Sequence, residues 1–157
     1  MLESSNLLDL LACTCSKIVQ REMKHNGSRS FRGRLLENIQ KSVESWLHGE
    51  EKKSKEEKHR SVLFCAELYR FNLVNVAICS WVAVTMTARI EEDEDCEELV
   101  VEFLKRAGKK WSEEAENRRE PLDGILATLR RRVEEEKAKD LGAVKGVLKM
   151  SDNKEWK

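Results

Sequence analysis

Two cysteines and a histidine near the start of the chain are residue types that bind zinc. Cys13 and Cys15 stand one residue apart, and His25 follows them. A structural zinc site normally has four ligands, with its cysteines paired at a spacing of two to four residues. Positions two apart on a helix also point in different directions. We therefore expect no metal site here and place Cys15 in the core.

Seven acidic residues surround Cys96 in the string EEDEDCEE, residues 91–98. Carboxylates are calcium ligands, but a calcium loop needs ligands at defined offsets and a glycine for its sharp turn. No glycine occurs in this run. We interpret it as a solvated helix N-terminus, where acids suit the helix dipole, and as a surface that could dock a basic partner.

The usual catalytic and nucleotide-binding patterns are absent from the sequence. His25, His48 and His59 fall at predicted helix ends or in a charged segment, with no serine or cysteine nucleophile motif around them. Neither GxGxxG nor GxxxxGK[ST] occurs, so no glycine-rich loop is predicted to cradle a phosphate. The sequence predicts a protein that is not an enzyme and needs no cofactor.

Basic side chains gather at two places and are candidates for binding phosphates or an acidic protein surface. Acidic residues follow both clusters, Glu113 and Glu114 after the first and 134–136 after the second. Contact with RNA through these clusters is therefore an alternative hypothesis rather than the leading one. The residues predicted for it are Lys105, Arg106, Arg130, Arg131 and Arg132.

The elements that position these residues are predicted from the spacing of apolar side chains. Steps of three and four recur along almost the whole chain, and no alternating segment with a hairpin turn signal appears. The sequence therefore predicts an all-α fold of about seven helices. Their expected ranges are 5–24, 28–48, 57–71, 73–88, 94–107, 119–136 and 138–150.

Details of this pattern predict how the helices are arranged. The segment at about 49–57 contains no apolar residue and is expected to be an exposed charged loop or a frayed helical extension. Pro121 is expected in the first turn of its helix. The run 73–88 is apolar all round, which predicts a helix in the middle of the fold, and it is too short to cross a bilayer. Short turns suit antiparallel pairs, stacked as an α-solenoid or closed as a bundle.

Length and composition set the remaining expectations. The 157 residues fit a single domain spanning 1–157, and 29 basic residues balance 29 acidic ones, so no global field draws the chain to nucleic acid or membrane. Five cysteines and no apparent leader segment argue against a secreted disulfide framework. We expect an intracellular, cytoplasmic protein, with the nucleus as the alternative.

Four strings in order give the chain a likeness to a known family. FRGRLLENIQKSVESW (31–46), VLFCAELYRFNLV (62–74), EELVVEFLKRAGKKW (97–111) and LGAVKGVLKMSDNKEWK (141–157) stand in this sequence with a charged spacer after the first. Together they resemble the middle domain of eukaryotic translation initiation factor 4 gamma. The likeness is greatest to the branches that interact with polyadenylate-binding protein or with stem-loop-binding protein.

This resemblance implies a HEAT-type α-solenoid of antiparallel helix pairs that binds a DEAD-box RNA helicase, with fewer pairs at the N-terminal end than the family usually has. It also implies that Glu67, Leu68 and Tyr69 are packing residues. The implied partner-binding residues lie in the C-terminal loops: Lys109, Lys110, Trp111, Arg118 and Arg119.

Three functions remain open from the sequence. The leading one is a non-catalytic adaptor in mRNA translation, which binds a DEAD-box helicase or another initiation protein. The second is an RNA-binding module in splicing or decay that uses the basic clusters directly. The third is a homodimeric interaction domain, in which a second copy covers the open N-terminal end of the helix stack.

Overall fold

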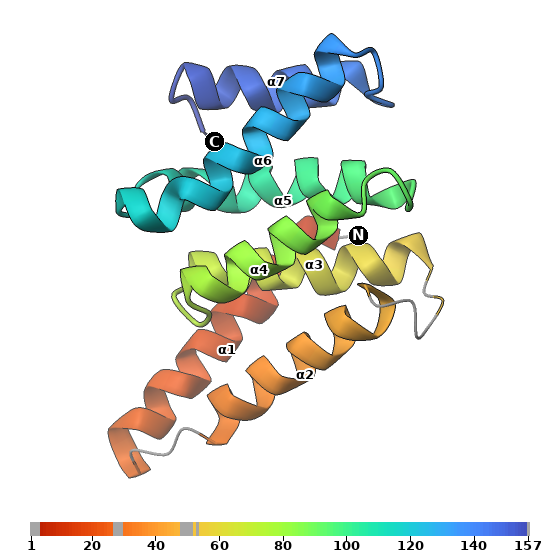
Figure 1. The fold of residues 1–157 in the computed structure, drawn as a ribbon. Helices are drawn as coiled ribbons and strands as arrows, with labels where there is room; N and C mark the ends of the chain where they lie inside the picture. The colour runs from red at the N-terminus through yellow and green to blue at the C-terminus, as the bar shows by residue number, and fades with distance from the viewer. Residues whose placement is uncertain (1–3, 27–29, 48–51, 53, 157) are drawn as a thin grey trace. The chain divides into compact units, whose positions relative to one another are not determined.

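The computed structural model describes residues 4–26, 30–47, 52 and 54–156 (Figure 1). Over these residues the chain is helical and contains no strand, which confirms the all-α prediction. None of the described helices is both long enough and apolar enough to cross a membrane. The helices are α1 (Ser4–Asn26), α2 (Ser30–Leu47), α3 (Lys55–Arg70), α4 (Val76–Ala88), α5 (Asp95–Ser112), α6 (Glu116–Glu134) and α7 (Leu141–Asp152).

Helix α3 begins inside the segment that was predicted to be a charged loop or a helical extension. The Ser54 hydroxyl accepts a hydrogen bond from the Glu57 amide at 3.3 Å, which caps the first turn. From residue 55 onward the segment is thus helical, which agrees with the helical extension and not with the loop, because a good cap and charged helix formers start the helix early. Residues 49–51 and 53 lie outside the described part.

Helix α6 begins earlier than predicted, so Pro121 lies inside the helix rather than in its first turn. Proline has no N–H to donate to the carbonyl of Asn117, four residues before it. Asn117 is exposed, so water can replace the missing donor there. The predicted start at 119 is late because proline favours the first turn of a helix.

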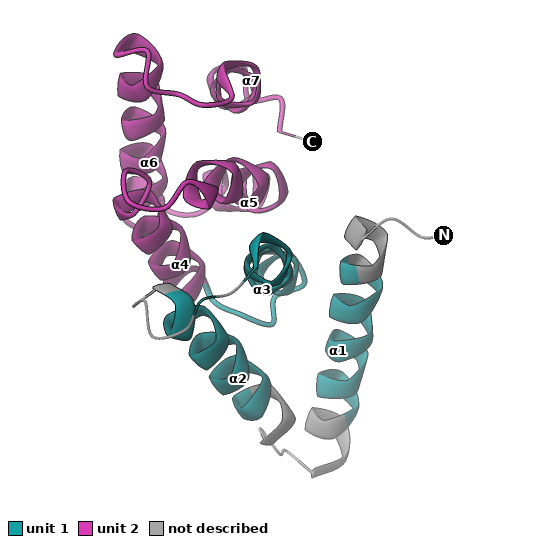
Figure 2. Ribbon diagram, turned by 90° about the vertical axis from the view of Figure 1, so that its right-hand side faces the viewer, with its two compact units in different colours: residues 1–75 teal, residues 76–157 magenta. Residues whose placement is uncertain are grey.

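The chain contacts itself as two compact units, residues 1–75 and 76–157 (Figure 2). In the first unit, α3 packs against both α1 and α2. Its core combines a buried stripe from each helix with Trp46, over whose ring the Lys58 ammonium lies at 5.6 Å. The expectation of one domain spanning 1–157 stays a prediction.

The second unit contains α4 to α7 in two layers. Helix α4 contacts α5 and α6, and α7 contacts α5 and α6. Figure 2 shows α4 and α6 on one side of this unit and α5 and α7 on the other. The consecutive pairs α4–α5 and α6–α7 are therefore packed against each other, with α5 supplying the largest buried side chains, Phe103 and Trp111.

The sequence predicted that the apolar run 73–88 would lie in the middle of the fold, but part of this run is exposed. Residues 71–75 form the turn after α3, and α4 starts only at Val76. Cys79, Val82 and Met86 are fully buried, whereas Val84 is 44% exposed. One side of α4 is thus left open to solvent in the described chain, because the second unit covers only the opposite side.

Three helices end in a left-handed residue that is not glycine: Asn72, Glu136 and Lys154, with φ of 62°, 57° and 54°. After each, the chain turns back and two amides bond to carbonyls of the last turn. At the end of α6, for example, Lys137 N donates to Arg132 O at 2.8 Å and Glu136 N to Val133 O at 3.2 Å. These are Schellman motifs, in which glycine is the preferred residue.

Glu136→Gly is therefore expected to raise the free energy of unfolding by about 0.5–1 kcal/mol, since a side chain in the left-handed region is strained and glycine is not. Glu135→Gly is the matched control, because Glu135 has φ −84° and gains nothing from glycine. Urea unfolding of both variants would measure the difference. A Glu136→Gly protein no more stable than the Glu135→Gly protein would contradict the expectation.

Candidate functional site

The five residues predicted to bind a partner lie near the junction of α5 and α6, but not in a loop. Lys109, Lys110 and Trp111 belong to the last turns of α5, and Arg118 and Arg119 to the start of α6. Trp111 is fully buried, and its ring N–H donates to the Arg118 carbonyl at 2.9 Å. Trp111 is thus a core residue that ties two helices together, and its side chain is not exposed as the expected partner-binding role requires.

Two of the four charged residues in that set, Arg118 and Arg119, already interact with other residues of the chain. Arg118 lies 3.8 Å from the Glu114 carboxylate, and the Arg119 guanidinium donates to the Ser112 carbonyl at 3.5 Å. Partial burial lowers the pKa of Lys110, and the nearby Glu114 carboxylate acts against that shift. Lys109 is exposed. The junction presents a small basic surface that could meet an acidic partner, without Trp111.

The residues predicted to bind RNA do not form one surface. Lys105 pairs with Glu102 at 3.2 Å, and Arg130 pairs with Asp152 on α7 at 2.5 Å. Arg132 is buried, which removes it from any phosphate-binding surface. Arg106 is half-buried and Arg131 is exposed. The sequence could not separate these neighbours, because consecutive residues of a helix point in different directions.

Arg132 instead forms a buried ion pair with Glu97. Its Nη2 donates to Glu97 Oε2 at 3.0 Å and its Nε to the same oxygen at 3.2 Å, while Nη1 donates to Glu91 at 2.6 Å. The other Glu97 oxygen accepts the backbone amides of Lys139 and Asp140 at 2.9 and 3.2 Å. Glu97 therefore joins the start of α5 to the end of α6 and to the turn before α7.

Glu97 corrects the interpretation of the acidic run as a solvated surface. Its side chain is 5% exposed, although Glu91, Glu94 and Glu98 around it are open to solvent. A buried carboxylate is tolerated where a cation and backbone N–H groups replace its water, as they do here. The run is a capping and pairing element as well as an exposed acidic surface.

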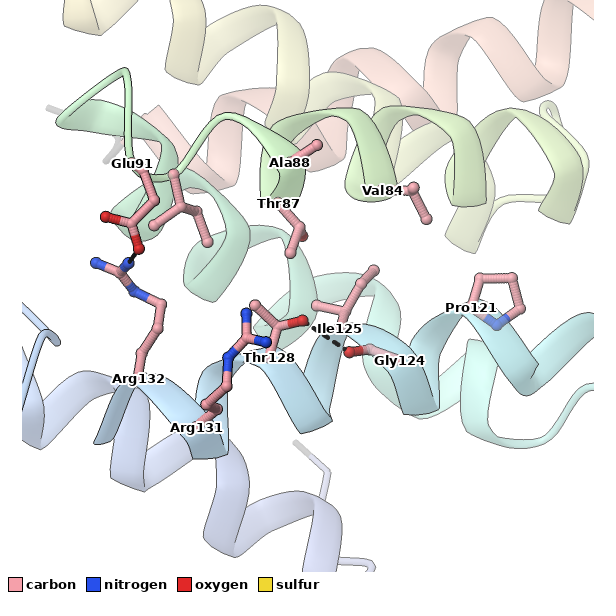
Figure 3. A pocket seen from close by; sticks show the side chains of 11 residues that line it. Val84, Thr87, Ala88, Glu91, Pro121, Gly124, Ile125, Thr128, Arg131 and Arg132 are labelled. Carbon is pink, nitrogen blue, oxygen red and sulfur yellow. Dashed lines mark hydrogen bonds and ion pairs between the residues drawn. The ribbon is translucent and has the colours of Figure 1, made fainter. Parts of the chain in front are cut away.

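A groove in the second unit lies between α4 and α6 and has a volume of about 620 Å³ (Figure 3). Ligand pockets in proteins are on the order of 300–1,000 Å³. The groove has two different ends: Val84 and Pro121 mark an apolar one, and Glu91 and the two arginines a charged one. The lining residues are Val84, Thr87, Ala88, Ile90, Glu91, Pro121, Gly124, Ile125, Thr128, Arg131 and Arg132.

No sequence motif marked this groove, and it was not predicted. Its α6 wall uses positions 121, 124, 125, 128, 131 and 132, which repeat at steps of three and four like any helix face. The available signal was the small and polar character of that face, with Gly124 and Thr128 opposite the apolar core face. Such a face is ordinarily solvated, so its chemistry alone did not identify a site.

The cysteines do not assemble a metal site in the described part of the chain. No group of three or more histidine, cysteine, aspartate or glutamate side chains there has metal-binding geometry. Cys13 and Cys15 are half-buried on α1, and the His25 side chain lies outside the described set. The prediction that Cys15 belongs to the core is correct only in part, because it remains partly exposed.

Thiol reactivity should separate the cysteines into two groups. Burial raises the pKa of Cys65 to about 12, and Cys79 and Cys96 are equally inaccessible. Because the thiolate is the reactive form, we expect iodoacetamide at pH 8 to modify only Cys13 and Cys15 in the native protein. Peptide mass spectrometry before and after denaturation would measure this. Native-state labelling of Cys65 as fast as Cys13 would contradict it.

No family model, curated protein or solved structure matches the chain. The likeness to the initiation-factor family therefore rests on the four sequence strings given above. Any function assigned to the protein must be argued from its own residues, of which the Glu97–Arg132 pair and the α4–α6 groove are the most distinctive.

Proposed function

We propose that the protein is a non-catalytic adaptor with a HEAT-type stack of helix pairs, acting in mRNA translation by binding an initiation protein such as a DEAD-box RNA helicase. The observation that carries the adaptor proposal is the open α4–α6 groove on a two-layer unit. The assignment to translation comes from the sequence resemblance. Positioning of partners would be the mechanism, so no residue performs chemistry.

The HEAT-type arrangement is supported by the second unit. There α4 and α6 contact each other in one layer, and α5 and α7 contact each other in the other. Stacked pairs in a solenoid make this pattern of neighbours, and the surface of one layer is then available to partners. The buried Glu97–Arg132 pair adds a fixed link between the two pairs, which suits a rigid scaffold.

Purified full chain should bind a purified DEAD-box helicase of the initiation machinery with a dissociation constant of about 10 μM or lower, which corresponds to the affinity of a typical transient complex. Polyadenylate-binding protein is the second protein to test. Absence of binding to either at about 100 μM, in light-scattering-controlled calorimetry, would reject the translation assignment.

A homodimeric interaction domain is a second candidate, because α1 has a second apolar side. Leu8, Ala12 and Val19 are buried, but Leu11 and Ile18 remain 45% and 38% exposed. Leu11 and Ile18 are separated by two helical turns and so lie on one face. Sedimentation equilibrium showing a monomer at tens of micromolar would reject this candidate, while Leu11→Asp should dissociate any dimer that forms there.

A further inference from the structure

We propose that the α4–α6 groove binds one amphipathic helix of a partner protein, which presents an apolar face to the groove and a carboxylate to Arg131. This inference rests on the proposed adaptor function and assigns it a site and a ligand chemistry. Three observations support it. The groove has an apolar lining, the described residues that form it offer no strand edge, and Arg132 is paired within the chain whereas the Arg131 guanidinium is not.

The apolar surface that a partner can reach lies mainly on α4, at Val84 and Ala88. Val84 is 44% exposed, Ala88 is also exposed, and Pro121 on α6 is half-buried. Figure 3 shows Val84 and the buried Ile125 facing the same space from the two helices, so Ile125 forms the floor of the groove. Transfer of such surface from water to a partner's apolar face supplies the driving force for binding.

The helical walls of the groove favour a helix as the segment that binds there. Both walls are helices whose backbone groups are already bonded internally, so the groove offers no strand edge to pair with an extended peptide. An extended segment would lose water from its amides without gaining partners. A helix satisfies its own amides and can lie in an apolar groove with side chains at steps of three and four.

Small residues on α6 let a partner helix approach closely. A Cβ placed on Gly124 would have no neighbour within 4 Å, so the space above α6 is empty there. Thr128 is turned onto its own helix, because its hydroxyl donates to the Gly124 carbonyl at 3.1 Å. The α6 wall from Pro121 to Arg132 is about 16 Å long at a rise of about 1.5 Å per residue, which accommodates about three turns of a partner helix.

One end of the groove is lined by charged side chains. Arg132 is held by Glu91 and Glu97, so it has no capacity for a further anion. Arg131 is exposed, and its guanidinium makes no ion pair or hydrogen bond with any residue that the structure describes. Glu91 and Glu97 together compensate the charge of Arg132, so the cation that this end of the groove offers to a partner is Arg131. An acidic residue at the matching end of the partner helix complements it.

A peptide of defined sequence can test the site. The probe is an acetylated peptide of about 15 residues with leucines at alternating steps of three and four and two glutamates in its first turn, where acids also stabilise the helix. It is added to ¹⁵N-labelled full chain, and amide shifts are followed by NMR. We expect shifts centred on Ala88, Gly124 and Thr128, with a dissociation constant on the order of 100 μM.

Gly124→Leu is the blocking variant, because its side chain fills empty space and replaces a glycine inside a helix, which favours folding. Gly146→Leu on α7 is the matched control, since its Cβ also meets no neighbour within 4 Å and it lies outside the groove. We expect Gly124→Leu to weaken peptide binding at least about tenfold and Gly146→Leu to leave it unchanged.

Charge reversal tests the orientation of the helix. Arg131→Glu should weaken binding of the acidic peptide about threefold to tenfold and strengthen binding of a peptide with lysines in place of the two glutamates. Arg130→Glu is the control, because Arg130 pairs with Asp152 and does not line the groove. Equal effects of the two substitutions would reject Arg131 as the anchor.

Three results would overturn the inference: no shifts at about 1 mM peptide, shifts centred on Leu11 and Ile18 instead, or unchanged binding by Gly124→Leu. These outcomes are separable from failure of the proposed function. If the helicase binds wild type and Gly124→Leu equally, the adaptor function stands and the groove is not its site. If the peptide binds at Gly124 but no initiation protein does, the groove stands and the translation assignment fails.

Discussion

Arg132→Met is expected to lower the free energy of unfolding by about 3–5 kcal/mol. Methionine fills a similar volume but leaves the Glu97 carboxylate buried, with two backbone amides and no cation. An uncompensated buried charge costs far more than the net stabilisation that an intact pair contributes. For a domain whose total stability is about 5–15 kcal/mol, this is a large fraction. Urea unfolding followed by circular dichroism would measure it.

The neighbouring Arg131→Met is the matched control, since Arg131 is exposed and should change stability by less than about 0.5 kcal/mol. Glu97→Gln combined with Arg132→Met should be more stable than Arg132→Met alone. Glutamine can still accept the Lys139 and Asp140 amides, and no buried charge remains. Similar small losses in Arg131→Met and Arg132→Met would show that the pair is not buried in solution.

Trp111→Ala is expected to lower the free energy of unfolding by a similar amount, about 3–5 kcal/mol. The ring is completely buried in the second unit and is the largest of its fully buried side chains. Its removal leaves a cavity and also leaves the Arg118 carbonyl without the indole N–H. Thermal unfolding and urea titration would both report the loss.

Trp111→Phe separates the two contributions, because phenylalanine keeps much of the ring but cannot donate to the Arg118 carbonyl. We expect the free energy of unfolding of the Trp111→Phe protein to lie between those of the Trp111→Ala protein and the wild type. Lys109→Ala, two residues away and exposed, should lie within about 0.5 kcal/mol of wild type. If Trp111→Ala folded with wild-type stability yet lost a partner, the surface role first predicted for Trp111 would be correct instead.

The helices were predictable because their signal is local. Apolar side chains at steps of three and four located all seven helices of the described residues, and the acids predicted at a helix start are found in the first turn of α5. Helix ends were harder. The pattern predicts a helix that ends at 107, yet α5 continues to Ser112, and Gly108 is needed because a Cβ there would meet the Trp156 ring at 2.5 Å. That approach depends on a residue far along the chain.

The buried charges were missed for the same reason. Glu97 and Arg132 are 35 residues apart, and neither has a partner nearby in sequence that predicts burial. A signal was present, because Glu97 continues the apolar stripe of Val101, Leu104 and Gly108 by one turn. A charge at a stripe position indicates a buried pair, since charged residues are almost never fully buried alone. The open side of α4 had no such signal.

The turn between α6 and α7 has a consequence for how the second unit opens. Its left-handed Glu136 aims the following backbone at Glu97, and the Lys139 and Asp140 amides are held by that carboxylate. The last helix therefore cannot detach without exposing the ion that anchors α5 to α6. Hydrogen exchange in α7 should then report cooperative opening of the unit rather than fraying from its end, so the C-terminal helix behaves as part of one foldon with α5 and α6.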